Sequence, residues 1–245
     1  MRLKCKGSPE NRTVALSLPH NRGKRGWSLR KAPLTNNRIK FVLAVIEIAA
    51  ICAFAVSGLI EAVRKRMDVV GVFTVAFVTA FGGGTLRDLL LDRRPLSWVQ
   101  HQEYVWLVLG LTLAGPPLLG LMRHRWADRL MQATDAIGLG LFAASGAAFA
   151  LAAGMPIIVV VLLGVVTGVF GGVLRDVLCN EIPVVFHDHR PYALCAFFGC
   201  WVLVGLDATG AAFWISLLAG AGTTTGLRLL ALAMDCKIPS WSKEN

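Results

Sequence analysis

Long apolar stretches separated by short polar links dominate the chain after residue 40. A helix needs about 20 mostly apolar residues to cross the hydrocarbon core of a membrane, and seven stretches come within a few residues of that length. They are 41–63, 69–91, 104–122, 131–153, 156–179, 191–207 and 211–234. Their residues do not alternate between apolar and polar, as the strands of a membrane barrel do. The pattern therefore predicts an all-α integral membrane protein with seven transmembrane helices.

The charge of the chain is concentrated in its first 40 residues. The 245 residues include 25 Lys and Arg against 15 Asp and Glu, a net charge of +10. Residues 1–40 hold 11 of the basic residues and a single acid, Glu10, so the rest of the chain is neutral overall. This distribution excludes a basic body that binds nucleic acid. We expect residues 1–40 to form a basic, disordered tail without the apolar core of a secretory signal.

The most informative pattern is an internal repeat with an offset of 88 residues. Of the 58 positions from 47 to 104, 18 are identical to the residue 88 positions later, and the match needs no gap. The segment Gly83–Asp88 (GGTLRD) falls on Gly171–Asp176 (GGVLRD). Apolar bias alone does not reproduce such a motif, so the chain contains a duplicated unit.

Each unit contains three predicted spans, residues 41–122 and 131–207, and the span at 211–234 lies outside the repeat. An odd number of crossings starts the second unit on the opposite side of the membrane, so we expect two inverted copies. Inverted repeats are common in proteins that move solutes. The links after the first and third spans are the richest in Arg and Lys. This predicts an N-terminus outside and a C-terminus in the cytoplasm of an inner-membrane protein, although the basic tail argues for the reverse.

Glycine motifs lie in the second and fifth spans. Gly82, Gly83 and Gly84 belong to the second span, and Gly171 and Gly172 belong to the fifth. Consecutive glycines permit a kink or a broken helix, and a break exposes carbonyl groups that membranes tolerate only beside protein or a wet cavity. The alternative is close helix packing through small residues. Because the motif is duplicated and followed by charges, we favour a pore or binding site at paired breaks.

Two charged pairs follow the glycines within one turn. They are Arg87 with Asp88 and Arg175 with Asp176. Adjacent helical residues point about 100° apart, so one hypothesis pairs each Arg with the Asp of the other repeat. The alternative places both pairs at helix ends, where the side chains reach the headgroups.

Six further polar residues occupy equivalent positions in the two units. They are Glu47 and Asp135, Ser57 and Ser145, and Thr79 and Thr167. Carboxylates in a solute path attract cations, and hydroxyls can act as ligands. The alternatives are interfacial carboxylates and hydroxyls that bond to their own helix.

Other chemistry has weaker support. His187, Asp188 and His189 lie together in the link after the fifth span, but three ligand types in a link are a weak indication of a metal site. The sequence contains no Walker motif and no nucleophile–base pattern, so we expect no enzyme, no cofactor and no resident metal.

The duplicated GG-x-x-Arg-Asp motif in two three-helix units, followed by a seventh helix, resembles the prokaryotic TRIC (trimeric intracellular cation) channel family. The same domain is also labelled a glycine transporter domain. The resemblance covers about residues 41–234, although Phe170 stands where the first unit has Gly82. It implies a homotrimer embedded in membrane lipids, with a K⁺-conducting pore in each subunit among the first, second, fourth and fifth spans, kinked at the glycines.

The leading hypothesis is therefore a monovalent-cation channel. The alternative is a secondary transporter of a small zwitterion such as glycine, in which Arg holds a carboxylate and an acid holds an amine. A third possibility is a membrane scaffold or receptor without a solute path.

Overall fold

Helices account for all the regular secondary structure in the residues that the structure describes. The structure is a computed structural model, and it describes residues 37–120, 124–187 and 191–234. The helices are α1 (Asn37–Arg64), α2 (Val69–Leu90), α3 (Ser97–Gln100), α4 (Gln102–Gly120), α5 (His124–Ala152), α6 (Ile157–Leu178), α7 (Val184–His187), α8 (Ala193–Ala208) and α9 (Phe213–Ala233). The all-α fold class is confirmed.

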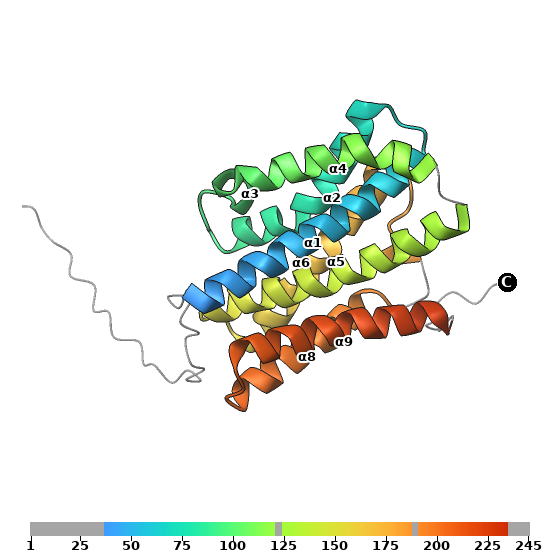
Figure 1. Ribbon diagram of the computed structural model, residues 1–245. Coiled ribbons are helices and arrows are strands. Elements are labelled where there is room, and N and C mark those ends of the chain that lie inside the picture. Colours follow the sequence, from blue (N-terminus) through green and yellow to red (C-terminus); the bar gives the residue numbers. More distant parts are fainter. Residues whose placement is uncertain (1–36, 121–123, 188–190, 235–245) are drawn as a thin grey trace, which may run out of the picture.

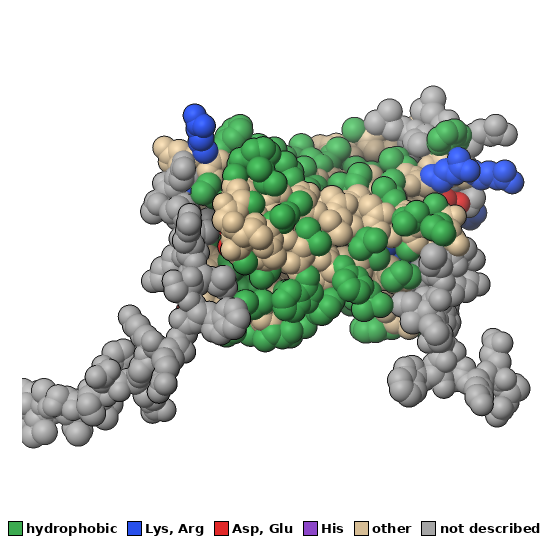
Figure 2. All heavy atoms as spheres, turned by 90° about the horizontal axis from the view of Figure 1, so that it is seen from below, with side chains coloured by type: hydrophobic (Ala, Val, Ile, Leu, Met, Phe, Trp, Pro, Cys, Tyr) green, Lys and Arg blue, Asp and Glu red, His purple; other side chains and the backbone are tan. Residues whose placement is uncertain are grey.

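Five of these helices, α1, α2, α5, α6 and α9, are long and apolar enough to cross a membrane. The helix α8 is apolar but has only 16 residues, and α4 contains Pro116 and Pro117. Figure 2 shows an apolar surface along the middle of the molecule, with Lys and Arg side chains gathered at its two ends. This distribution matches a protein whose middle faces lipid and whose ends face water.

Four helices form the centre of the bundle. The pairs α1–α2, α2–α6, α5–α6 and α1–α5 pack side by side, whereas α1 and α6, and α2 and α5, lie diagonally across from each other with few contacts. The helix α4 covers α1 and α2, and α8 and α9 pack together against α5. Figure 1 shows that α1 and α5 run in opposite directions.

The repeat in the sequence corresponds to a repeat of helices. A shift of 88 residues places α2 (69–90) on the bounds of α6 (157–178), and it places α1 within one residue of the bounds of α5. The short helices α3 and α7 also correspond, within one residue at each end. Each unit therefore has the order long, long, short, long.

The helices α2 and α6 pack through their glycines and run antiparallel. A Cβ atom on Gly83 would overlap the carbonyl oxygen of Thr167, and one on Gly171 would lie 2.5 Å from the carbonyl oxygen of Thr79. The two contacts occur in opposite order along the two helices, so α2 and α6 cross antiparallel between them. This close approach is the small-residue packing that the sequence left as the alternative.

Some sequence expectations about boundaries and breaks were wrong. The helix α1 begins at Asn37, so residues 37–40 are helical and do not belong to a tail, while residues 1–36 lie outside the described part. The helix α5 begins at His124, before the expected 131, because hydropathy marks only the apolar part of a helix. Both α2 and α6 remain α-helical through their glycines, so neither is broken.

Candidate functional site

A buried arginine network lies near the end of α2, and we call it the first half-site. Arg87 is fully buried; its Nη1 atom lies 2.7 Å from Oε1 of Glu47 in α1, and its Nη2 atom lies 2.9 Å from Oδ1 of Asp88. Nη2 also donates to the Ser97 hydroxyl at 3.0 Å. One guanidinium therefore holds α1, α2 and the start of α3 together.

The turn after α2 places Asp88 where it caps α3. The helix ends with Asp92 in the left-handed region, φ 50°, a conformation that Asp and Asn tolerate better than most residues. The chain then folds back, and the Oδ2 atom of Asp88 accepts hydrogen bonds from the backbone N–H and the hydroxyl of Ser97. The carboxylate satisfies donors at the first turn of α3 while it pairs with Arg87.

The second half-site repeats this arrangement at the end of α6. Arg175 is 1% exposed; its Nη1 atom lies 2.6 Å from Oδ1 of Asp135 in α5, and its Nη2 atom lies 2.9 Å from Oδ1 of Asp176. Asp176 accepts a hydrogen bond from the backbone N–H of Val184, the first residue of α7. Nη1 of Arg175 also donates to the hydroxyl of Ser57 at 2.6 Å. Ser57 belongs to the other repeat, so this network crosses between the two units.

The hypothesis of pairing between repeats was wrong, and of its alternative only the position at the helix ends is confirmed, since Arg87 and Arg175 lie in the last turns of α2 and α6. Arg87 binds its own neighbour Asp88, and Arg175 binds its own neighbour Asp176, with no exchange between repeats in the described residues. The argument from Cβ directions failed because the long Arg side chain can turn back to the next residue. Both arginines are buried within the protein, so they do not reach the headgroups.

The arginines of both half-sites are compensated by carboxylates. In the first half-site Arg87 and Arg93 face Glu47 and Asp88, with Nη1 of Arg93 3.7 Å from Oδ1 of Asp88, so the formal charges balance when all four groups are ionised. In the second half-site Arg175 faces Asp135 and Asp176. Buried charges need such partners because a lone ion in the bundle would lose its hydration. The carboxylates cancel the positive charge of the arginines, which would otherwise repel a cation from the core.

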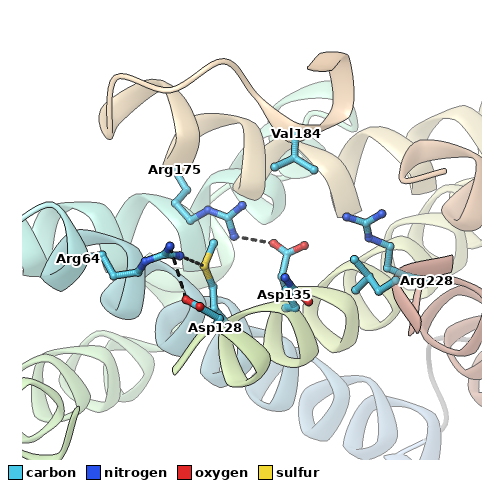
Figure 3. A pocket seen from close by; sticks show the side chains of 9 residues that line it. Arg64, Asp128, Asp135, Arg175, Val184 and Arg228 are labelled. Carbon is cyan, nitrogen blue, oxygen red and sulfur yellow. Dashed lines mark hydrogen bonds and ion pairs between the residues drawn. The ribbon is translucent and has the colours of Figure 1, made fainter. Parts of the chain in front are cut away.

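The second half-site opens onto a cavity of about 290 Å³. Figure 3 shows Asp135, Arg175 and Arg228 directed toward the same space, with Arg64 and Asp128 on one side. Because charged side chains line much of its wall, the cavity suits water or a polar solute.

Two ion pairs join the repeats at this end. Arg64 Nη2 at the end of α1 lies 3.5 Å from Oδ1 of Asp128 in α5, and Lys65 pairs with Glu181 after α6. The hydrogen bond from Lys65 lowers the pKa of Glu181, and the same bond raises the pKa of Lys65. Both groups therefore stay charged around neutral pH.

The first half-site is more enclosed. Phe149 of α5 lies against two guanidiniums, with Arg87 at 4.2 Å and Arg93 at 4.1 Å from the ring centroid. The adjacent cavity, lined in part by Glu47 and Arg87, measures about 20 Å³, room for about one water molecule. The position that corresponds to Phe149 in the first repeat is Glu61, so the two ends differ in chemistry.

The hydroxyl residues mostly bond to their own helices. Thr79 and Thr167 donate to Val75 and Leu163 carbonyls at 2.6 Å, and Ser145 donates to the Phe142 carbonyl at 3.2 Å. For these three residues, the structure agrees with the alternative that the hydroxyls bond to carbonyls of their own helix. Ser57 differs because its hydroxyl accepts a hydrogen bond from Arg175.

Several residues of the site were not found from the sequence. No sequence motif indicated four of them, which are Arg64, Ser97, Asp128 and Arg228. The pairs Glu47–Arg87 and Asp135–Arg175, by contrast, have the same separation of 40 residues, which the repeat makes visible. The cluster around Asp188 and His189 lies outside the described residues.

Comparison with known proteins assigns the family. The family model described as "Glycine transporter" matches residues 44–115 and 132–208. A UPF0126 membrane protein of Vibrio cholerae is 35% identical over 201 residues, which cover 82% of this chain and 83% of the relative. The UPF0126 inner membrane protein YadS of Escherichia coli K12 is 30% identical over 199 residues, 80% of this chain and 95% of the relative.

Solved structures agree with this assignment. A TRIC trimeric intracellular cation channel orthologue from Rhodobacter sphaeroides is 36% identical, with a TM-score of 0.74 over 80% of this chain and 99% of that chain. The chain belongs to the prokaryotic TRIC family. A second TRIC cation channel structure is 33% identical, with a TM-score of 0.72 over 82% of this chain and 98% of that chain. With inner-membrane relatives and five apolar spans, this TRIC-family chain is a multi-pass inner-membrane protein.

Proposed function

We propose that this chain is a monovalent-cation channel that conducts K⁺. Seven crossings in two inverted three-helix repeats plus α9 would enclose one path per subunit, among α1, α2, α5 and α6, in a lipid-embedded homotrimer. The observation that carries the proposal is the pair of equivalent, buried half-sites in this four-helix core, in each of which carboxylates compensate the arginine.

The positions of the half-sites support a path along the bundle. Arg87 and Arg175 each lie about six residues beyond the crossing of α2 and α6, toward opposite ends. At 1.5 Å per residue, their axial separation is about 18 Å. A cation that moves along the bundle would therefore meet one carboxylate-rich site, cross the middle, and meet the other.

The arginines fit cation flow because they are compensated. Each of these guanidiniums is held by two carboxylates, so a passing ion does not meet an unpaired positive charge. Related TRIC structures are described as cation channels, which supports the same activity here. The glycine motifs at Gly82–Gly84 and Gly171–Gly172 are the points where we expect α2 and α6 to bend when the path opens. In that bent state, Ser57, Ser145, Thr79 and Thr167 would offer hydroxyls to the ion.

Planar bilayers test the proposal directly. Purified full-length protein in a KCl gradient should give currents whose reversal potential lies near the K⁺ equilibrium potential. Anion-selective currents, or silent bilayers that contain verified, folded protein, would contradict it.

A second candidate function has one observation in its favour. Asp135 and Arg228 face the same cavity of about 290 Å³, and this combination suits the amine and carboxylate of glycine. A secondary transporter would accumulate radiolabelled glycine in proteoliposomes with saturable kinetics, whereas a channel would not accumulate it.

A further inference from the structure

Two aromatic rings meet in the middle of the four-helix core. Phe54 of α1 and Phe142 of α5 occupy equivalent positions in the two repeats, 88 residues apart. They are 0% and 2% exposed, and their ring centroids lie 5.3 Å apart. Residues that are related by the repeat and touch each other lie at its pseudo-symmetry axis, so this pair marks the centre of the bundle.

The two rings reach diagonally across the bundle. Phe54 extends from α1 to α6, where a Cβ on Gly171 would lie 2.9 Å from its Cε2 atom. Phe142 extends from α5 to α2, where a Cβ on Gly84 would lie 3.8 Å from its Cε1 atom. Because α1–α6 and α2–α5 are the diagonal pairs, the rings fill the space between all four helices. The glycines thus make room for the rings.

The pair also separates the two charged half-sites. Glu47 precedes Phe54 by seven residues and Asp135 precedes Phe142 by seven, about 10 Å along each helix. Since α1 and α5 run in opposite directions (Figure 1), the two carboxylates lie on opposite sides of the rings. Phe142 lines the small cavity of the first half-site, and the larger cavity adjoins the second half-site.

We propose that Phe54 and Phe142 form a hydrophobic gate at the middle of the ion path, an inference that rests on the channel function proposed above. An apolar constriction blocks ions because they cannot shed their water there, and it opens when the space widens enough to become wet. The described state is the closed one. Separation of the rings, through bending of α2 and α6 at the glycines against which they pack, would open it.

Substitutions of similar shape but different polarity test the gate. Asn and Leu side chains each have four heavy atoms branched at Cγ, so Phe142→Asn and Phe142→Leu both remove the ring, but only Asn attracts water into the constriction. We expect Phe142→Asn to raise the time-averaged K⁺ current in bilayers at least tenfold, and Phe142→Leu to change it less than threefold. Phe54→Asn and Phe54→Leu should behave in the same way.

Two further variants provide a control away from the gate and a milder change within it. Phe197 belongs to an aromatic cluster on α8 with Phe198 and Trp201, so Phe197→Asn should leave the current within twofold of wild type. Phe142→Tyr keeps the ring and adds one hydroxyl, and it should raise the current in the same direction as Asn by a smaller factor. Size-exclusion profiles and helical circular dichroism identify the folded variants to be compared.

Osmotic water permeability of proteoliposomes separates the gate from the channel function. A gate that becomes wet passes water, so Phe142→Asn should raise the permeability severalfold while Phe142→Leu does not. If Asn raises water flux but no variant conducts K⁺, the gate stands and the channel function fails. If wild type conducts K⁺ but Asn and Leu variants have equal currents and equal water permeability, the gate is overturned. If Asn changes neither flux, the gate is also overturned.

Discussion

At position 83, the main chain of α6 excludes every side chain. A Cβ there would overlap the Thr167 carbonyl oxygen, an atom of helical backbone that cannot move without distorting α6. From the sequence we favoured helix breaks at the glycine motifs, whereas the structure shows unbroken helices in close contact. A Gly-Gly pair permits both a broken helix and a close approach, and only the neighbouring helix decides between them.

We expect Gly83→Ala to destabilise the protein by about 1–3 kcal/mol, the usual cost of overpacking a tight contact. Gly110 in α4 is the matched control because no atom lies within 4 Å of a Cβ at that position. Gly110→Ala should be neutral or stabilise by up to about 1 kcal/mol through helix propensity. Thermal unfolding in detergent measures both variants. Equal melting temperatures for the two would contradict the packing role of Gly83.

The partners of the buried arginines were also not predicted from the sequence. The sequence selected Arg87 and Arg175 as the central charges, and the structure places both in full burial. It did not give their pairing, because a side chain with four rotatable bonds can satisfy several geometries. The repeated separation of 40 residues between acid and arginine was the signal for Glu47 and Asp135.

Among the helices, the second half-site ties more elements together than the first. Arg175 reaches α5 through Asp135, α7 through Asp176 and α1 through Ser57. Within the described residues, the bonds of Arg87 join helices of the first repeat alone. The hydrogen bond between Ser57 and Arg175 therefore joins the two repeats, whereas the equivalent Ser145 bonds within its own helix.

Alanine at these two equivalent serines should have unequal effects. Ser57→Ala removes a buried bond to a charged donor, which costs about 1.5–3 kcal/mol. Ser145→Ala removes only a bond to the Phe142 carbonyl of its own helix and should cost less than about 1 kcal/mol. Thermal unfolding in the same detergent compares them. A larger loss for Ser145→Ala would show that the tie between repeats contributes little.

The sequence predicted the apolar parts of the long helices well and the short helices not at all. Apolar length is a strong signal, so α2 and α6 lie within one or two residues of the expected spans. The four-residue helices α3 and α7 have no periodicity to detect. They depend on Asp88 and Asp176, whose capping role follows from the turns after α2 and α6 and requires tertiary structure.

For the whole molecule, the repeat was the most informative sequence feature because it relates the helices of the first unit to those of the second, which hydropathy alone does not. It placed equivalent charges in equivalent helices, and antiparallel packing then put them at opposite ends of the core. The repeat did not predict the difference between the ends. Phe149 and Arg93 enclose the first half-site, whereas Glu61 and Glu181 occupy the equivalent positions at the second.

The two ends of the bundle also differ in their flanking charge, which gives a prediction of orientation. The start of α1 and the end of α9 lie at opposite ends of the molecule (Figure 1). The end that carries the larger cavity also carries Arg64 at the end of α1 and Lys65 and Arg66 after it, together with Arg125 and Arg129 at the start of α5. By the positive-inside rule, this end faces the cytoplasm together with the end of α9.

Fusions at the C-terminus test this orientation in cells. Green fluorescent protein folds in the cytoplasm, and alkaline phosphatase is active only outside it, so we expect a fluorescent first fusion and an inactive second one. The basic residues before position 37 argue for the opposite orientation, so the same fusions should be repeated with those Lys and Arg residues changed to Gln. An unchanged result would show that the links set the orientation. A phosphatase-active, non-fluorescent C-terminus in both forms would place the larger cavity on the periplasmic side, where Asp135 and Arg175 would meet ions entering the cell.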